Sequence, residues 1–158
     1  MPDRPASEQA SGSSGLKATK APFEGLAGLR VLLVDDTEDA LETFRYLLEH
    51  AGCTVRCAAS AQAAIALTDQ AEFDLMISDV SMPHMNGYEL VAELRNRART
   101  AALPAIALTG HGGAHDVKQA FAAGFQAHVD KPVDFEHMKR VIATVIGAAR
   151  AGQAPTAS

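Results

Sequence analysis

The apolar runs of this chain end in polar side chains that could bind a metal ion and a phosphoryl group. The residues that follow these runs are Asp35, Asp36, Asp79, Thr109, Asp130 and Lys131. Carboxylates that lie close together repel one another, and this repulsion raises their pKa values. A hard divalent cation removes the conflict, and several oxygen ligands with open positions beside them suit Mg²⁺.

The same side chains could carry phosphoryl chemistry. A magnesium ion beside a carboxylate can hold an incoming phosphoryl group and neutralise its charge. The carboxylate can then act as a nucleophile and become an acyl phosphate. Lys131 can supply a positive charge to one phosphoryl oxygen, and Thr109 can donate its hydroxyl proton to another. The pattern therefore indicates phosphoryl transfer to an aspartate.

These residues meet only if the segments before them form one parallel sheet. Short apolar runs predict five strands, over 29–34, 54–58, 74–78, 104–108 and 126–129. Apolar residues at helical spacing predict five helices: one that includes Leu41 to Leu48, one capped by Ser60 that runs to Leu67, 88–97, 114–123 and Phe135 to Ile146. Alternating strands and helices indicate a doubly wound α/β fold. Because the sites of such sheets lie outside the carboxyl ends of the strands, we expect the polar residues to converge on one rim.

Length and composition set the class of protein. A chain of 158 residues with 47% hydrophobic and 21% charged residues is typical of one soluble domain. The pattern predicts a flexible leader over 1–27, a folded domain over 28–149 and a disordered tail over 150–158.

The net charge of −5 argues against a nucleic-acid partner, and the basic run Arg95, Arg97 and Arg99 is interpreted as a solvated helix end. No apolar run is long enough to cross a membrane, and two cysteines are too few for a disulfide scaffold, so we expect a cytoplasmic protein.

The motifs at the strand ends resemble those of the receiver domain of two-component signalling, the response-regulator family. They are VLLVDD with Asp35 and Asp36, LMISDVSMPHMNG with Asp79, ALTG with Thr109 and VDKPV with Lys131. The resemblance covers residues 29–147. It implies a flavodoxin-like, five-stranded parallel sheet with the strand order 2-1-3-4-5.

The resemblance implies a role for each matching residue of the site. Asp79 would be the phosphoacceptor. Mg²⁺ would be bound by Asp36, by Asp35 directly or through water, by Asp79 and by the backbone carbonyl of Ser81. Lys131 would pair with the phosphoryl group, and Thr109 would move toward it as the switch residue.

Further positions would support or tune this site. Pro132 would follow a cis peptide bond, and Gly87 would lie where a side chain does not fit. His128 occupies the position of the family's aromatic switch residue, and a partly buried strand histidine without that role is the alternative. Ser81 and His111 would tune the lifetime of the phosphoryl group, and the alternative is that both are solvated loop residues.

The expected function is that of a signalling domain and not of an enzyme. A sensor histidine kinase or a phosphotransfer protein would supply the phosphoryl group. Phosphorylation would change the face formed by the fourth helix, the fifth strand and the fifth helix, where a downstream protein docks. The segments outside the domain are too short and too polar for an attached output domain, so the chain would act as a free regulator or as the receiver of a hybrid kinase in a phosphorelay.

Two other functions fit the predicted fold less well. A haloacid dehalogenase-type phosphatase also uses an aspartate nucleophile with Mg²⁺, but it needs an acid two residues after that nucleophile. Thr37 stands at that distance from Asp35 and Glu38 at that distance from Asp36, and the sequence pattern predicts no cap domain. A flavodoxin-like flavin protein needs a phosphate-binding loop rich in Ser, Thr and Gly after the first strand. Asp35 and Asp36 stand there instead, and they would repel a phosphate.

Overall fold

Five strands and five helices alternate along the chain in the computed structural model, which describes residues 26–110 and 114–151. The strands are β1 (Arg30–Val34), β2 (Thr54–Ala58), β3 (Leu75–Asp79), β4 (Ala105–Thr109) and β5 (Ala127–Asp130). The helices are α1 (Glu38–His50), α2 (Ala61–Gln70), α3 (Gly87–Arg95), α4 (Ala114–Ala123) and α5 (Phe135–Arg150). The predicted alternation is confirmed.

The folded unit reaches slightly beyond the predicted range of 28–149. Leu26 is fully buried, and Arg150 is the last residue of α5. The rest of the predicted leader and nearly all of the predicted tail, residues 1–25 and 152–158, lie outside the described residues.

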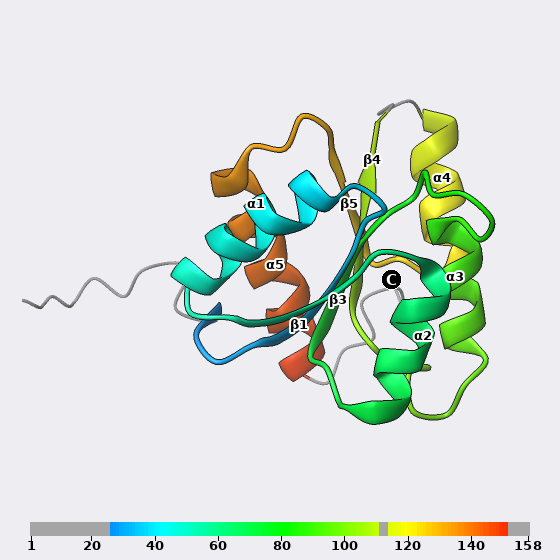
Figure 1. The fold of residues 1–158 in the computed structure, drawn as a ribbon, viewed down its shortest axis with the longest axis horizontal. Helices are drawn as coiled ribbons and strands as arrows, with labels where there is room; N and C mark the ends of the chain where they lie inside the picture. The colour runs from blue at the N-terminus through cyan, green and yellow to red at the C-terminus, as the bar shows by residue number, and fades with distance from the viewer. Residues whose placement is uncertain (1–25, 111–113, 152–158) are drawn as a thin grey trace, which may run out of the picture.

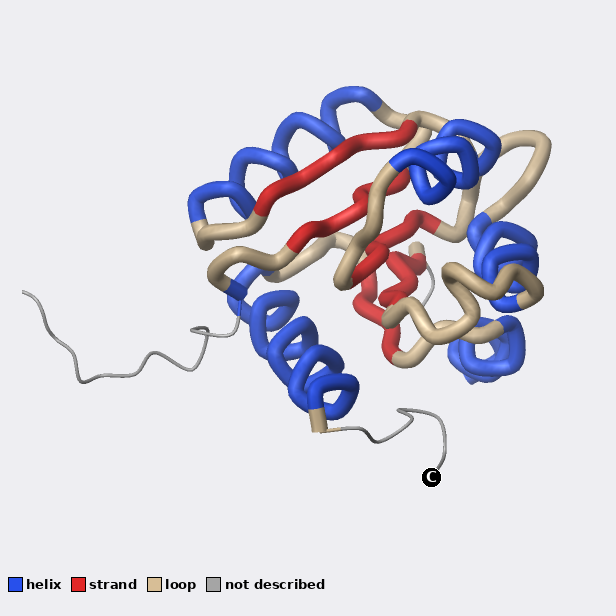
Figure 2. The backbone as a smooth tube through the Cα atoms, turned by 90° about the horizontal axis from the view of Figure 1, so that it is seen from below, coloured by secondary structure: helices blue, strands red, loops and turns tan. Residues whose placement is uncertain are grey.

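All five strands are parallel and lie in the order β2-β1-β3-β4-β5, which confirms the predicted sheet. Helices α1 and α5 cover one face of the sheet, and α2, α3 and α4 cover the other (Figure 1). Figure 2 shows the same layers from below, with helices on both sides of the strands. No helix within the described ranges is long and apolar enough to span a bilayer.

Each face of the sheet has its own apolar core. Val31 and Leu33 of β1 pack toward α1 and α5, whereas Leu32 and Val34 pack toward the other three helices. Every residue of β3 and β4 is buried. A strand covered on both faces needs a continuous apolar run instead of an alternating pattern, and this is why the sequence shows such runs. The polar residues of the predicted site stand at the carboxyl ends of these apolar runs, where Asp35, Asp79 and Thr109 are themselves buried.

Side-chain caps set the starts of α2 and α3. The hydroxyl of Ser60 accepts a hydrogen bond from the backbone N–H of Ala63 at 3.1 Å, which confirms the predicted cap of α2. Asn86 accepts from the backbone N–H of Glu89, and Glu89 accepts from the backbone N–H of Asn86, both at 2.9 Å. This capping box starts α3 at Gly87, only eight residues after Asp79.

Gly87 lies against the backbone at the end of β3. Its N–H donates to the carbonyl of Val80 at 3.0 Å. A Cβ added here would overlap the carbonyl oxygen of Asp79 and would come within 2.7 Å of the Val80 Cα atom. The predicted exclusion of a side chain at this position is therefore confirmed.

We expect Gly87→Ala to lower the free energy of unfolding by about 1–3 kcal/mol, because the loop after β3 must move to admit the methyl group. Gly147 in α5 has nothing within 4 Å of an added Cβ and is the matched control. Gly147→Ala should stabilise the protein by about 0.5–1 kcal/mol, since alanine is the better helix former. Urea unfolding measures both effects, and a Gly87→Ala protein as stable as wild type would contradict this packing argument.

Arg95 fastens the end of α3 to the end of α4. Its half-buried guanidinium donates to the carbonyl oxygen of Gly124 at 2.8 and 3.1 Å. It also donates to the carbonyl of Thr100 at 3.0 Å and to Gln126 Oε1 at 3.2 Å. Burial lowers the pKa of Arg95, and the partial negative charge at the C-terminus of α4 offsets the cost of burying the cation. The prediction of a solvated helix end is therefore wrong for Arg95.

Candidate functional site

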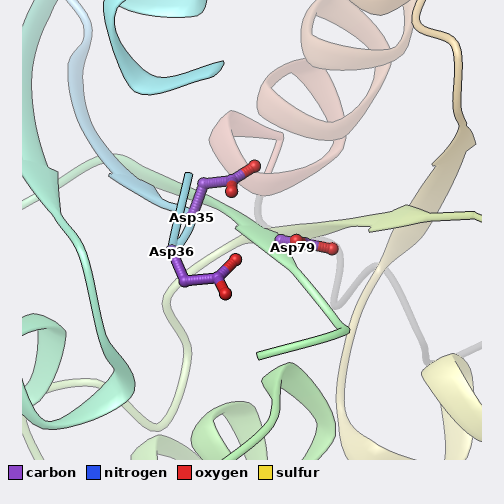
Figure 3. A group of neighbouring side chains, drawn as sticks. All are labelled: Asp35, Asp36 and Asp79. Carbon is purple, nitrogen blue, oxygen red and sulfur yellow. The ribbon is translucent and has the colours of Figure 1, made fainter. Parts of the chain in front are cut away.

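Three carboxylates meet at the carboxyl ends of β1 and β3. Oxygen atoms of Asp35, Asp36 and Asp79 all lie within 4.8 Å of one another (Figure 3). The two strands are direct neighbours in the sheet, so the loops that leave them start side by side. The predicted convergence of these three residues is confirmed.

Asp35 is the most constrained of the three. Its side chain is buried, and Oδ1 accepts a hydrogen bond from the backbone N–H of Thr37 at 2.8 Å. Oδ2 is also buried and has no hydrogen-bond partner. Burial raises the pKa of Asp35, the Thr37 hydrogen bond opposes this, and the negative charge of Asp79 adds to the increase. An ionised carboxylate oxygen without a partner is costly, so this atom favours a bound cation.

Asp79 is held by two donors on one oxygen. Oδ1 accepts from the backbone N–H of Ser81 at 3.1 Å and lies 3.1 Å from the ammonium nitrogen of Lys131. The Asp79 side chain is 5% exposed. Because both contacts are to Oδ1, the second oxygen takes part in neither.

Lys131 comes from the loop between β5 and α5. Its backbone N–H donates to the carbonyl of Thr109 at 2.7 Å, which ties the loop to the end of β4. The peptide bond from Lys131 to Pro132 is cis, as predicted. The loop after the edge strand β5 therefore places the ammonium group of Lys131 next to the acidic cluster of Asp35, Asp36 and Asp79.

The hydroxyl of Thr109 is directed to Asp130 in this structure. Thr109 Oγ1 donates to Asp130 Oδ1 at 3.1 Å, and His128 Nε2 lies 3.6 Å from the same oxygen. The sequence placed Asp130 at the rim without giving it a role. The signal that could have found this contact is the pairing of β4 with β5, in which Thr109 and Asp130 are register partners.

A hollow of about 390 Å³ opens between the loops that follow β3 and β4. Ser81 and Thr109 line it, together with Tyr88 and Asp116. Ser81 is exposed, and its backbone N–H, not its carbonyl, contacts Asp79. His111, predicted to tune the phosphoryl lifetime, lies outside the described residues.

Residues 31–143 match the family model of the response regulator receiver domain. The chain belongs to this family. The haloacid dehalogenase and flavin-binding alternatives receive no support from this match. The protein is a receiver domain of two-component signalling, and its strand order is the one expected for that family.

Relatives of this receiver differ greatly in length. An uncharacterised 14.6 kDa protein of Leptolyngbya boryana is 37% identical over 76% of this chain and 92% of its own length. The hybrid signal transduction histidine kinase D of Dictyostelium discoideum is 31% identical over 77% of this chain and 8% of its own length. The sensor histidine kinase AruS of Pseudomonas aeruginosa is 34% identical over 84% of this chain and 13% of its own length.

Two solved structures are close in fold to this receiver. The chemotaxis protein CheY4 of Vibrio cholerae is 31% identical, with a TM-score of 0.72 over 75% of this chain and 99% of that chain. The receiver domain of a sensor histidine kinase of Pseudomonas aeruginosa is 26% identical, with a TM-score of 0.71 over 77% of this chain and 99% of that chain. The second structure has a magnesium ion coordinated in its active site cleft.

Proposed function

We propose that Asp79 accepts a phosphoryl group from the phosphohistidine of a sensor histidine kinase or of a histidine phosphotransfer protein. The observation that carries this proposal is the pairing of a nearly buried Asp79 with Lys131 inside a cluster of three carboxylates. A carboxylate oxygen of Asp79 attacks phosphorus, and the bond from phosphorus to the donor's imidazole nitrogen breaks. The bonding electron pair stays on that nitrogen, which is neutral after transfer or takes a proton from water. The product is an acyl phosphate on Asp79.

We further propose that Mg²⁺ is required, with Asp35, Asp36, Asp79 and the backbone carbonyl of Ser81 as its protein ligands. The unpartnered Oδ2 of Asp35 and the shared position of the three carboxylates support this assignment. The solved kinase receiver with magnesium in its cleft supports it as well. When bound, the cation neutralises negative charge on the carboxylates and on the phosphoryl oxygens.

Lys131 and Thr109 act on the phosphoryl group after transfer. Lys131 lies next to Asp79 and supplies a positive charge to a phosphoryl oxygen. Thr109 lies at the end of the neighbouring strand and can donate its hydroxyl proton to a second phosphoryl oxygen. Thr109 then exchanges its hydrogen bond to Asp130 for one to the phosphoryl group. This exchange favours a different arrangement of β4, α4 and β5, which is a shift between two populated states.

The surface that reports this change is the α4–β5–α5 face. Phe121 of α4 is an exposed aromatic residue there and lies edge-on to His128 of β5. We propose that a downstream protein binds this face. Two versions of the pathway fit: a free regulator, as the match to the full length of CheY4 favours, and a relay receiver within a hybrid kinase, as the kinase relatives favour.

Intact mass measured after incubation with Mg²⁺ and acetyl phosphate tests the proposal. We expect one added phosphoryl group, and none when EDTA replaces Mg²⁺, because the carboxylate cluster repels an anionic donor without the cation. A phosphorylated histidine phosphotransfer protein is the second donor, for a receiver that accepts only from proteins. No adduct from either donor, or an adduct of equal yield in EDTA, would contradict the proposed function.

A further inference from the structure

Asp130 and Thr109 form a pair across the last two strands of the sheet. They are register partners of β4 and β5, so their side chains lie on the same face of the sheet. Thr109 is 1% exposed, whereas the Asp130 side chain is 56% exposed. The Thr109 hydroxyl donates its proton to Asp130 Oδ1. A hydroxyl has a single proton, so the same bond cannot be made to Asp130 and to a phosphoryl oxygen at once.

The same Asp130 oxygen also reaches the output face. His128 Nε2 lies 3.6 Å from it, and His128 stands two residues earlier on the same side of β5. The His128 ring is edge-on to Phe121 of α4, with 6.4 Å between ring centroids. One carboxylate therefore contacts both the buried hydroxyl near the acidic cluster and the histidine beside α4.

We propose that Asp130 is a positioning residue that holds the Thr109 hydroxyl in the unphosphorylated state and competes with the phosphoryl group for its proton. This inference rests on the proposed function of Asp79. When the Thr109 hydroxyl donates to a phosphoryl oxygen instead, water and His128 remain as the partners of Asp130. The exposure of Asp130 keeps the cost of this release small, because water can replace the lost hydrogen bond. Asp130 thereby weakens the interaction of Thr109 with the phosphoryl group and so opposes the switch. The loss of the Thr109 hydrogen bond also changes the contact between Asp130 and His128.

Titration with beryllium fluoride, a stable mimic of the phosphoryl group, tests the competition in the full chain with Mg²⁺ present. Asp130→Ala should tighten binding by about tenfold, the value of one hydrogen bond to a charged acceptor. Asp130→Asn keeps an oxygen acceptor of the same shape but without the charge, so it should tighten binding by only about threefold. Circular dichroism checks that the variants fold.

The double variant separates a role through Thr109 from a simple charge effect. In a Thr109→Val background the hydroxyl is gone, so adding Asp130→Ala should leave the affinity for beryllium fluoride unchanged. If Asp130→Ala tightens binding equally in both backgrounds, Asp130 acts only as a repelling charge and the proposal is wrong. Wild-type protein that does not bind beryllium fluoride with Mg²⁺ would contradict the proposed function instead.

The link to His128 is tested without any phosphoryl mimic. We expect the imidazole NMR signals of His128, assigned with a His128→Gln variant, to shift in both Asp130→Ala and Thr109→Val. In the first variant His128 loses its partner, and in the second the Asp130 oxygen is freed from Thr109. Signals that stay unchanged in both variants would overturn the inference even if Asp79 accepts phosphate.

Discussion

Asp79→Asn is expected to abolish phosphoryl acceptance completely while the protein stays folded. The amide that replaces the carboxylate has no ionised oxygen to attack phosphorus. Its oxygen can still accept the hydrogen bond from the backbone N–H of Ser81, so the loop after β3 keeps its contact. The variant also removes one of three clustered charges, which relieves repulsion and compensates for the lost ion pair with Lys131. Intact mass after treatment with either phosphodonor measures the loss.

Asp134→Asn is the matched control for this experiment. Asp134 is an exposed residue that caps α5 by accepting from the backbone N–H of Glu136 at 3.0 Å. Asparagine caps helices as well as aspartate does, so stability should be kept. This variant should accept a phosphoryl group as wild type does. A phosphoryl group that persists in Asp79→Asn would place the acceptor on another side chain.

Asp35→Asn is expected to have two large effects of opposite sign. Without metal the variant should be more stable than wild type by about 1–2 kcal/mol, because the buried group at the Oδ2 position, which has no partner, no longer carries charge. The affinity for Mg²⁺ should fall by about 100-fold, because one carboxylate of the cluster becomes neutral. Calorimetric Mg²⁺ titration and urea unfolding in EDTA measure the two effects separately.

The pH dependence of stability gives the same prediction a second readout. The pKa of Asp35 is raised above its usual value of 3.8, so the folded state binds this proton more tightly than the unfolded state. The contribution of Asp35 to stability therefore falls as pH rises from 3.8 through the raised pKa, and Asp35→Asn should remove this fall. Asp36→Asn is the control: Asp36 is exposed, so this variant should lose Mg²⁺ affinity without becoming more stable. A metal-free Asp35→Asn protein less stable than wild type would contradict the account of Oδ2.

Much of the site could be predicted because it follows from topology alone. Once strands and helices alternate, Asp35, Asp79 and Thr109 must stand at the same edge of one sheet, whatever the packing between them. The apolar runs before them are unbroken because both faces of the central strands are covered.

The contacts within the site could not be predicted in the same way. The bond from Thr109 to Asp130 depends on the register of β4 against β5. In the short edge strand β5 only Val129 is buried, so its side-chain pattern does not fix that register. The unpartnered oxygen of Asp35 depends on how the loop after β1 folds back. The solvated position predicted for Arg95 is wrong because the oxygens of Thr100 in the loop after α3, and of Gly124 and Gln126 in the loop after α4, are close enough to replace water.

The contacts of Arg95 have a mechanical consequence for α4. The helix has ten residues, so it is about 15 Å long. Arg95 donates two hydrogen bonds to the carbonyl oxygen of Gly124, just beyond the C-terminal end of this helix. A helix that is held at one end tilts about that end when its other end is displaced. If Thr109 moves as proposed, we therefore expect α4 to tilt about its C-terminal end, with the smallest displacement at Gly124. Arg95→Met removes these hydrogen bonds, so we expect α4 to shift as a whole in this variant instead of tilting.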